Sequence, residues 1–530
     1  MKLKFAGLGT VAAVALMVGL SMSGALAQDR HYATGAKLTP PELKQSIAQA
    51  PVYRDFLPQA VDLSKYMPPV GDQGNQGSCV GWATAYAARA YYAEQVEHRD
   101  TALPQNVPSP AWLYNLIHEA NNCDSGSLVP DAMEVLRSGA LSLKEFPYDD
   151  TKCPRPLPPL RAKATDFKID SYEAVFDQQR GLVDLDGVKG ALAKGNPVVV
   201  VGILDKAFMN LSPLHKVWHA DADSPSEGGH AFTIVGYDDR TKTFKFINSW
   251  TTGWGDQGYG FLTYDTFLAR IAEGYIMHLP GDPEIALAEA DFTPTPVEDV
   301  QVFTPPVLNV HPTSASRDVL ATTALVDVGP LACGKVDIAT DADGNSVATG
   351  FVGTEAELDR VGEALKGKVD DNQVSLAPWP ACELKLTLAS QLGESDVPQT
   401  VVDPQAPKVG DALQIGVQSP GFASYLYAAY FSADGTVLNL TQPTSLDLKA
   451  KAPHTQVKFG DQQPSGMALT VSKPVGAEML VVVASEKPLF AAALPDSLTD
   501  RQFLSSLRTA LLAGDAGRVT ATVMPVTTLE

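Results

Sequence analysis

The sequence predicts a multidomain α+β protein whose first large domain joins a helical half to a β half. Helical periodicity dominates before about residue 195, and short apolar runs typical of strands dominate after it. The third observation is length, because 530 residues exceed what one hydrophobic core normally holds. We therefore expect a two-lobed domain over residues 61–282, with a cleft between its lobes.

The elements of this domain follow from local patterns. Alanines and aromatics alternate with polar residues over Ala83–Ala93, which predicts a helix directly after Cys79. Pro110–Ala120 and Pro130–Ser138 each begin with a proline, which suits the first turn of a helix. Four short apolar runs predict strands in the β half: Pro197–Ile203, Ala231–Tyr237, Phe244–Asn248 and Gly260–Tyr264.

Changes in amino-acid composition predict the boundaries of the other segments of the chain. Residues 28–60 are polar and contain several prolines, so we expect an extended lead-in. Residues 283–325 and 393–408 have the composition of linkers. They flank a small α/β unit at residues 326–392 and precede a β-rich accessory domain at residues 409–530.

Within the small unit, Asp341–Asn345 predicts a turn between two short strands, and Thr354–Leu365 predicts an amphipathic helix. A calcium loop is the alternative interpretation of this turn. Ser346 and Val352 oppose it, because they stand where such a loop needs glycine and glutamate. The accessory domain has strand patterns, and one closing helix pattern, at Gly410–Ser419, Tyr425–Phe431, Val437–Leu440, Met479–Ala484 and Asp500–Leu512.

The N-terminus has the pattern of an export signal over residues 1–27. Two lysines precede a short apolar run, and Ala25–Ala27 supplies small residues for cleavage. An uncleaved anchor is the alternative. We expect the protein to be exported, to the periplasm or beyond, and not to be inserted in a membrane once the signal is removed. The net charge of −21 argues against nucleic acid or an anionic membrane surface as a partner.

The cysteine count then becomes informative. Five cysteines in an exported protein leave one thiol over. Cys123 and Cys153 share one region, and Cys333 and Cys382 share another, so two local disulfides account for four of them. The unpaired residue is then Cys79.

Cys79 has a catalytic context. It follows a Gly-rich and Gln-rich run and precedes a predicted helix, whose N-terminal dipole lowers the pKa of a thiol. His230 would take the thiol proton and return it to a leaving amine, and Asn248 would orient the imidazole. Gln73 would stabilise an oxyanion together with the backbone N–H of Cys79. This set of residues predicts acyl transfer.

These residues resemble the papain-like cysteine peptidases over residues 61–280. Gln73 stands six residues before Cys79, as the oxyanion glutamine does in that family. Gly228–Asp239 resembles the family's catalytic-histidine strand, and Phe246–Trp250 resembles its asparagine segment. The resemblance implies a two-lobed fold, peptide-bond hydrolysis, and a role for Trp250 in shielding the Asn–His hydrogen bond.

The resemblance carries further expectations. Phe146–Cys153 is similar to a family segment that ends in a half-cystine, which supports the Cys123–Cys153 pairing. Gln76 stands where many relatives carry a bridging cysteine, and Thr251 replaces a common glycine. In the family, the residue before the histidine helps to line the main specificity pocket. Here that residue is Gly229, which favours a small or hydrophobic substrate side chain.

Three alternatives remain open. A thiol acyltransferase of the transglutaminase type shares the thiol and histidine, but it usually carries aspartate where Asn248 stands. A catalytically latent, binding-only domain is the second. A metal site at His215 and His219 is the third, and it lacks the glutamate of a zincin, so we expect neither metal nor cofactor. The tail resembles a bacterial domain of unknown function that follows peptidases and kinases, and it is expected to bind a protein or cell-surface partner.

Overall fold

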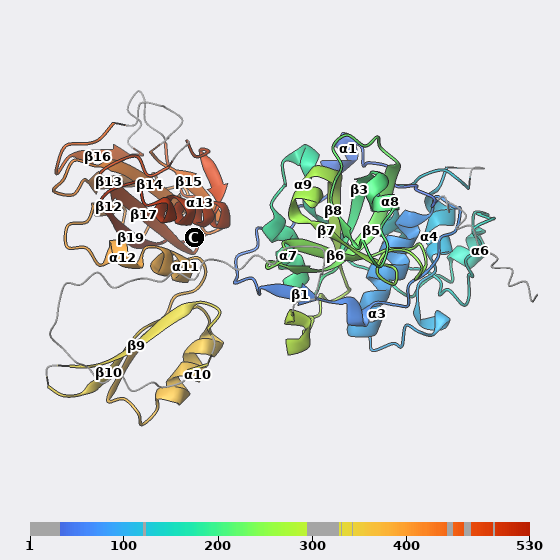
Figure 1. Ribbon diagram of the computed structural model, residues 1–530, viewed down its shortest axis with the longest axis horizontal. Coiled ribbons are helices and arrows are strands. Elements are labelled where there is room, and N and C mark those ends of the chain that lie inside the picture. The colour runs from blue at the N-terminus through green and yellow to red at the C-terminus, as the bar shows by residue number, and fades with distance from the viewer. Residues whose placement is uncertain are drawn as a thin grey trace, which may run out of the picture.

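Three units follow one another along the chain (Figure 1). The first has two lobes, the second is small, and the third is rich in strands. The expected signal peptide, residues 1–27, lies outside the described residues. The residues that the computed structural model describes are 32–119, 123–293, 328–329, 331–341, 343–441, 449–460, 468–490 and 493–530.

The helical lobe is built around one helix that starts at Cys79. It comprises α2 (Cys79–Gly81), the π-helical η2 (Trp82–Arg89) and α3 (Ala90–Gln95). Its many alanines let neighbouring elements approach closely. Both α4 (Pro110–Ile117) and α5 (Val129–Ser138) contact it. The three helices predicted for this half are therefore present.

The β lobe is one mixed sheet with the strand order β2-β8-β3-β5-β6-β7-β4, and β1 (Ala60–Asp62) pairs with β5. The lobes share one hydrophobic core, and Thr233 Oγ1 on β5 donates to the Ala83 carbonyl of the central helix at 2.9 Å. The four strands predicted here are present. Besides β1, the strands and helices of this lobe are β2 (Ser171–Asp177), β3 (Val198–Leu204), β4 (Val217–Trp218), β5 (Gly228–Asp238), β6 (Thr243–Ile247), β7 (Tyr259–Thr263), β8 (Ile271–His278), α7 (Leu185–Ala193), α8 (Lys206–Met209) and α9 (Tyr264–Arg270). The short helix α6 (Pro158–Arg161) lies at the helical end of the domain (Figure 1).

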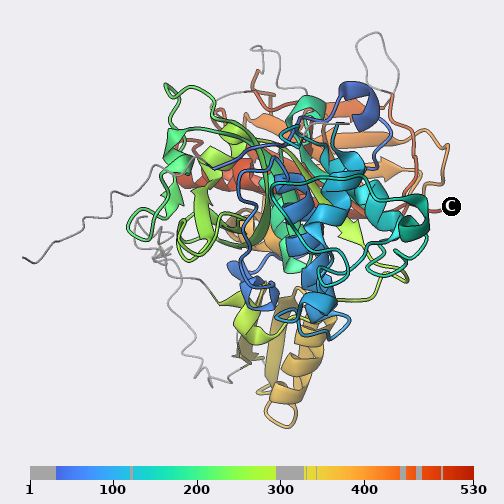
Figure 2. The same cartoon turned by 90° about the vertical axis from the view of Figure 1, so that its right-hand side faces the viewer.

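The small unit is a three-stranded sheet with one helix, α10 (Glu355–Leu365), against it (Figure 2). β10 (Ser346–Val352) is central, antiparallel to β9 (Gly334–Thr340) and parallel to β11 (Asp371–Leu376). The strands β9 and β10 flank the predicted turn. Thr354 caps α10 through a reciprocal bond with Glu357, so the helix starts where the sequence predicts.

The accessory domain has three layers. A five-stranded sheet, β18-β15-β14-β17-β19, lies between a three-stranded sheet, β12-β13-β16, and a layer of helices. The predicted strands and closing helix are present. The elements are α11 (Ala381–Thr387), α12 (Ala389–Leu392), β12 (Gln399–Asp403), β13 (Gln414–Gln418), β14 (Tyr425–Phe431), β15 (Thr436–Asn439), β16 (Gln456–Phe459), β17 (Ala477–Ser485), β18 (Ser497–Thr499), α13 (Asp500–Ala513) and β19 (Val519–Thr527).

Two linker expectations need correction. Residues 393–408 contain β12, which pairs with β13, so this stretch belongs to the accessory sheet. The helices α11 and α12 also pack into the accessory core, because Leu384 and Leu388 form one buried apolar face. The accessory unit therefore starts before residue 393. Residues 283–293 lie on the first domain through η5 (Glu289–Phe292), whereas 294–327 lie outside the described residues.

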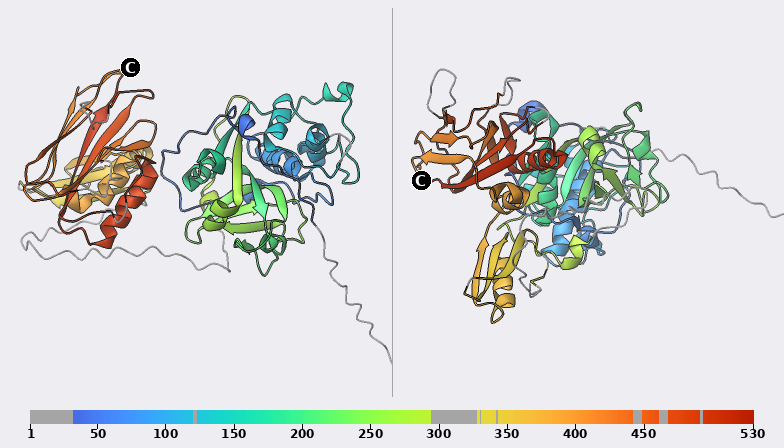
Figure 3. Two further views of the ribbon diagram at one scale, coloured as in Figure 1. Left: turned by 90° about the horizontal axis from the view of Figure 1, so that it is seen from above. Right: turned by 60° about the vertical axis from the view of Figure 1, so that its left-hand side comes forward.

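The lead-in is more structured than its composition suggests. It forms a short helix, α1 (Pro41–Lys44), and then passes between the first domain and the accessory domain (Figure 3). There Phe56 packs edge-on against Trp379, and Arg54 forms an ion pair with Asp500. Within the described ranges, no helix is both long and apolar enough to cross a membrane.

Candidate active site

The three residues predicted to form the catalytic centre come from different elements and meet between the lobes. Cys79 is the first residue of α2, His230 lies on β5, and Asn248 follows β6. The His230 Nε2 atom is 2.8 Å from Asn248 Oδ1. The other ring nitrogen, Nδ1, has no hydrogen-bond partner among the described residues. The Cys79 sulfur lies near the backbone of Ala231, the residue after His230.

Aromatic side chains cover the His–Asn hydrogen bond. The ring of Trp250 packs on the imidazole of His230 with 4.5 Å between centroids. Phe208 supports Trp250 edge-on from behind, and both side chains are buried. Trp250 therefore stands where the sequence predicted a shielding residue. Excluding water strengthens this hydrogen bond electrostatically.

Three neighbours hold the side chain and the backbone of Gln73 in place. Ser249 Oγ donates to Gln73 Oε1 at 2.7 Å, which identifies the oxygen end of the side chain. The Tyr148 hydroxyl donates to the Gln73 backbone carbonyl at 2.7 Å. The amide nitrogen, Nε2, donates to the Gln76 carbonyl at 3.0 Å. One N–H of this amide is thus held in place and the other is available to a carbonyl in the cleft.

The cleft is filled by the protein's own residues 32–45, here called the leader. Gly35 and Ala36 donate their backbone N–H groups to the Gly229 carbonyl at 3.0 and 2.9 Å. Ser127 pairs with the leader's other edge, since its N–H donates to Gly35 O and its carbonyl accepts from Lys37 N. The leader therefore passes between Gly229 and Ser127, and it forms an isolated β-bridge from Ala36 to Ser127.

The leader also contacts the predicted catalytic groups. The Ala33 carbonyl accepts from Gln73 Nε2 at 3.0 Å, where the amide was expected to bind an oxyanion. Tyr32 stacks on the ring of Trp250 at 4.6 Å and 10°. A side chain at Gly35 would clash with backbone, because its Cβ would lie 2.2 Å from Gly77 O. Glycine is required here for the leader to approach the loop before Cys79.

Burial under the leader determines the protonation states of Cys79 and His230. Cys79 and His230 are both fully buried. Burial raises the pKa of the Cys79 thiol to about 11, against a partial lowering by the backbone of Ala231, Gly35 and Val80. Burial also lowers the pKa of His230 to about 4, although the bond to Asn248 raises it. Near neutral pH the covered site therefore holds a neutral thiol and a neutral imidazole.

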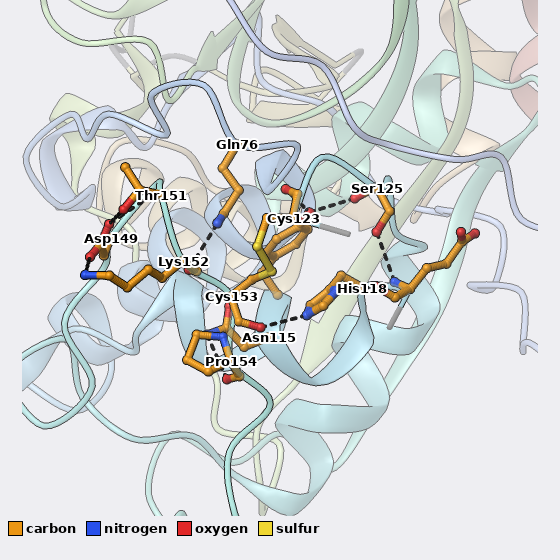
Figure 4. Close-up of a disulfide and its surroundings, with 12 residues drawn as sticks. Gln76, Asn115, His118, Cys123, Ser125, Asp149, Thr151, Lys152, Cys153 and Pro154 are labelled. Carbon is orange, nitrogen blue, oxygen red and sulfur yellow. Dashed lines mark hydrogen bonds and ion pairs between the residues drawn. A yellow bond between two sulfur atoms is a disulfide. The ribbon is translucent and has the colours of Figure 1, made fainter. Parts of the chain in front are cut away.

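The Cys123–Cys153 disulfide forms as predicted and braces the loop that carries Ser127 (Figure 4). His118 Nε2 is 3.0 Å from the Cys153 carbonyl, and Gln76 Nε2 donates to the Lys152 carbonyl at 3.3 Å. Gln76 therefore links the Cys79 loop to the disulfide loop at the position where relatives carry a cysteine. The Cys333–Cys382 disulfide is also present, and Cys79 is the free thiol.

Replacing both cysteines of the first bridge, as Cys123→Ser with Cys153→Ser, is expected to destabilise the first domain by about 3 to 4 kcal/mol. The bridge closes a loop of 30 residues, whose freedom in the unfolded chain would increase. Denaturant unfolding followed by tryptophan fluorescence measures the change. The matched pair Cys333→Ser with Cys382→Ser should leave this domain's transition in place, and equal shifts in both variants would contradict the assignment.

Thr251 occupies a backbone position that suits glycine. Its φ is 67°, and its Oγ1 accepts from Gly253 N at 3.1 Å. Glycine adopts a positive φ without steric cost, which explains why the papain-like peptidases commonly carry glycine at this position. Sequence reasoning missed the leader and Ser127, because both act through backbone groups. Small residues around Gly35 are the one sequence feature that permits such a close approach.

Together the helical lobe, the β lobe and the thiol between them form the papain-like fold that the sequence predicts. Residues 57–277 match the family model described as papain family cysteine protease. An uncharacterized peptidase C1-like protein of Acanthamoeba polyphaga mimivirus is 28% identical over 204 residues, and Peptidase 1 of Dermatophagoides farinae is 26% identical over 232 residues. The viral match covers 36% of this chain and 63% of the viral protein. The mite match covers 41% of this chain and 64% of the mite protein.

A comparison with solved structures also found cysteine proteases that match part of this chain. Xylellain, a cysteine protease from Xylella fastidiosa, is 24% identical, with a TM-score of 0.40. That match covers 48% of this chain and 97% of the other. Bromelain from Ananas comosus, in complex with the E64 inhibitor, is 19% identical with a TM-score of 0.35, covering 42% and 100%.

Proposed function

We propose that this protein is an exported cysteine-type endopeptidase that its own leader holds latent. The observation that carries the proposal is the His230–Asn248 hydrogen bond beside a free thiol at a helix start. The family match over residues 57–277 supports peptide-bond hydrolysis, and the two disulfides support export to an oxidising compartment. The substrate is a polypeptide.

The reaction follows from the positions of these groups. When the leader leaves, water and substrate reach the site, and the Cys79 proton passes to His230 Nδ1. The thiolate attacks the peptide carbonyl carbon, a C–S bond forms, and the carbonyl π electrons move to its oxygen. Gln73 Nε2 and the Cys79 backbone N–H donate to that oxyanion.

Collapse of this intermediate completes acylation. The C–N bond breaks as the imidazolium of His230 gives its proton to the leaving amine. A thioester remains on Cys79, and a water that His230 deprotonates hydrolyses it to the acid and the free thiol. Asn248 acts as a positioning residue, because its Oδ1 binds Nε2 of the ring and leaves Nδ1 to exchange the proton with the thiol. Gly229 offers its carbonyl, and Trp250 its ring, to the bound peptide, since the leader uses both.

The test requires a version of the protein with an uncovered cleft. Gln45 and Ser46 are exposed and follow α1, so a recognition sequence for a site-specific protease can be inserted between them in the chain 28–530. Cleavage followed by gel filtration in mild denaturant and refolding buffer removes the leader. We call the product the opened protein.

An epoxide inhibitor of papain-like enzymes should add once to the opened protein, as weighed by intact mass. The opened Cys79→Ala variant should give no adduct, because the nucleophile is absent. The opened protein should also hydrolyse casein, and the variant should not. A folded, opened protein without an adduct would contradict the proposal and favour a binding-only domain. Amine incorporation in place of hydrolysis would favour the acyltransferase.

A further inference from the structure

A short loop of the first domain carries its side chains into the two C-terminal units. This loop, here called the arm, comprises residues 51–57 and is anchored on the first domain at both ends. Before the arm, the Ala50 N–H donates to the Ala174 carbonyl of β2 at 2.9 Å. After it, the Pro58 carbonyl accepts from the Tyr237 hydroxyl of β5 at 2.6 Å. The arm therefore extends from a fixed base toward the accessory domain (Figure 3).

The arm places Phe56 in an apolar cluster where the small unit meets the accessory domain. The ring packs against the Cys333–Cys382 disulfide, which joins the two units. It also packs edge-on against Trp379, with 5.7 Å between ring centroids. Gly353 of the small unit leaves room for the ring, because a Cβ there would lie 2.5 Å from Phe56. Both C-terminal units therefore contribute to the contact with this side chain.

Arg54, two residues earlier on the arm, reaches a fully buried carboxylate. Its Nε atom lies 3.4 Å from Oδ2 of Asp500, which has no solvent exposure. Its guanidinium also donates to the Ala433 carbonyl. Trp379 Nε1 donates to the same Asp500 oxygen at 2.7 Å. The indole that contacts Phe56 therefore also orients the acid that binds Arg54.

The neighbouring residue of the accessory domain, Arg501, binds the backbone of the arm. Its guanidinium donates to the Asp55 carbonyl and lies 3.9 Å from the ring centroid of Trp379. It also lies 5.5 Å from the ring centroid of Tyr53. Recognition of alternate side chains together with a main-chain bond is typical of sites that bind extended peptides. Arginine and aromatic side chains are also the ones that contribute most to binding at protein interfaces.

We propose that the two C-terminal units form a binding site for an extended polypeptide with arginine two residues before an aromatic residue, and that the arm occupies this site. The buried carboxylate binds the arginine, and the indole and the disulfide contact the aromatic ring. The occupied site holds the C-terminal units on the first domain, independently of the proposed peptidase activity. The site consists of Gly353, Trp379, Ala433, Asp500 and Arg501.

Cutting the chain between the units tests whether this site holds them. A recognition sequence for a site-specific protease is inserted within residues 294–327 of the chain 28–530, and the cut protein is analysed by gel filtration at micromolar concentration. The two fragments should stay together in wild type and separate when Arg54→Ala and Phe56→Ala are combined. Separation of the wild-type fragments would overturn the proposal, and so would continued association in the double variant.

A matched pair on α13 tests the accessory side of the site. Arg501→Ala removes the bond to the arm and should weaken the association of the fragments. Arg508→Ala should not, because Arg508 lies on the same helix but pairs with Glu383 of the accessory domain itself. Equal losses in the two variants would overturn the assignment, since they would reflect general damage to the helix.

A peptide measures recognition directly. The uncut double variant has an empty site, and a fluorescent peptide of residues 50–58 should bind to it about tenfold or more tightly than the same peptide with alanine at positions 54 and 56. Fluorescence anisotropy measures both affinities. Uncut wild type should bind neither peptide, because its attached arm competes at a high effective concentration. A double variant that binds both peptides equally, or neither of them, would overturn the proposal.

Discussion

The opened protein is expected to react with iodoacetamide at Cys79 about 100-fold or more faster than the intact protein at pH 7.5. In the covered site burial raises the thiol pKa to about 11, so the thiolate fraction at this pH is very small. Opening admits water and lets His230 share the proton. Both changes lower the thiol pKa, and each unit changes the thiolate fraction about tenfold.

The pH profile separates this cause from simple access. For the intact protein the alkylation rate should rise about tenfold per pH unit up to about pH 11, because a neutral thiol titrates there. For the opened protein the rate should level off at a lower pH. Mass spectrometry of the labelled peptide measures both, with Cys79→Ala as the blank. If the two forms gave parallel pH profiles, the leader would not control the pKa of the Cys79 thiol.

The parts of this site that could be predicted from sequence are the parts with local patterns. Cys79 stands between a Gly-rich run and an alanine-rich helix, and each feature has a direct structural meaning. His230 and Asn248 adjoin strongly apolar strands, so their strands could be located within a few residues. The two local disulfides followed from position and count.

The leader could not be predicted because its contacts are non-local and use backbone atoms. The pairing of Gly35 with Gly229 joins residues far apart in sequence, and any small residues could make it. Strand β12 was missed for a related reason. Prolines at 398, 404 and 407 flank it, and they gave its region the composition of a linker. Its pairing with β13 supplies the partner that composition does not reveal.

Lys44→Met is expected to loosen the leader without any cleavage. The ammonium bonds Asp177 at 2.9 Å and Glu273 at 3.0 Å in a fully buried setting. Removing one partner of a buried ion pair costs about 3 to 5 kcal/mol, because the remaining charge is left desolvated. Here the cost applies to the covered state alone, because Lys44 contacts the two carboxylates only while the leader is in place. The uncleaved variant should therefore populate the open state roughly 100-fold or more above wild type.

Alkylation of uncleaved protein at pH 7.5 measures that population, and casein hydrolysis should increase with it. Lys37→Met is the matched control, because Lys37 is on the same leader but its partner, Glu119, is exposed. Exposed ion pairs contribute little, so this variant should stay as latent as wild type. If Lys37→Met and Lys44→Met opened the cleft equally, the effect would come from losing any leader lysine and not from the buried ion pairs of Lys44. If neither did, the buried ion pairs would not hold the leader at all.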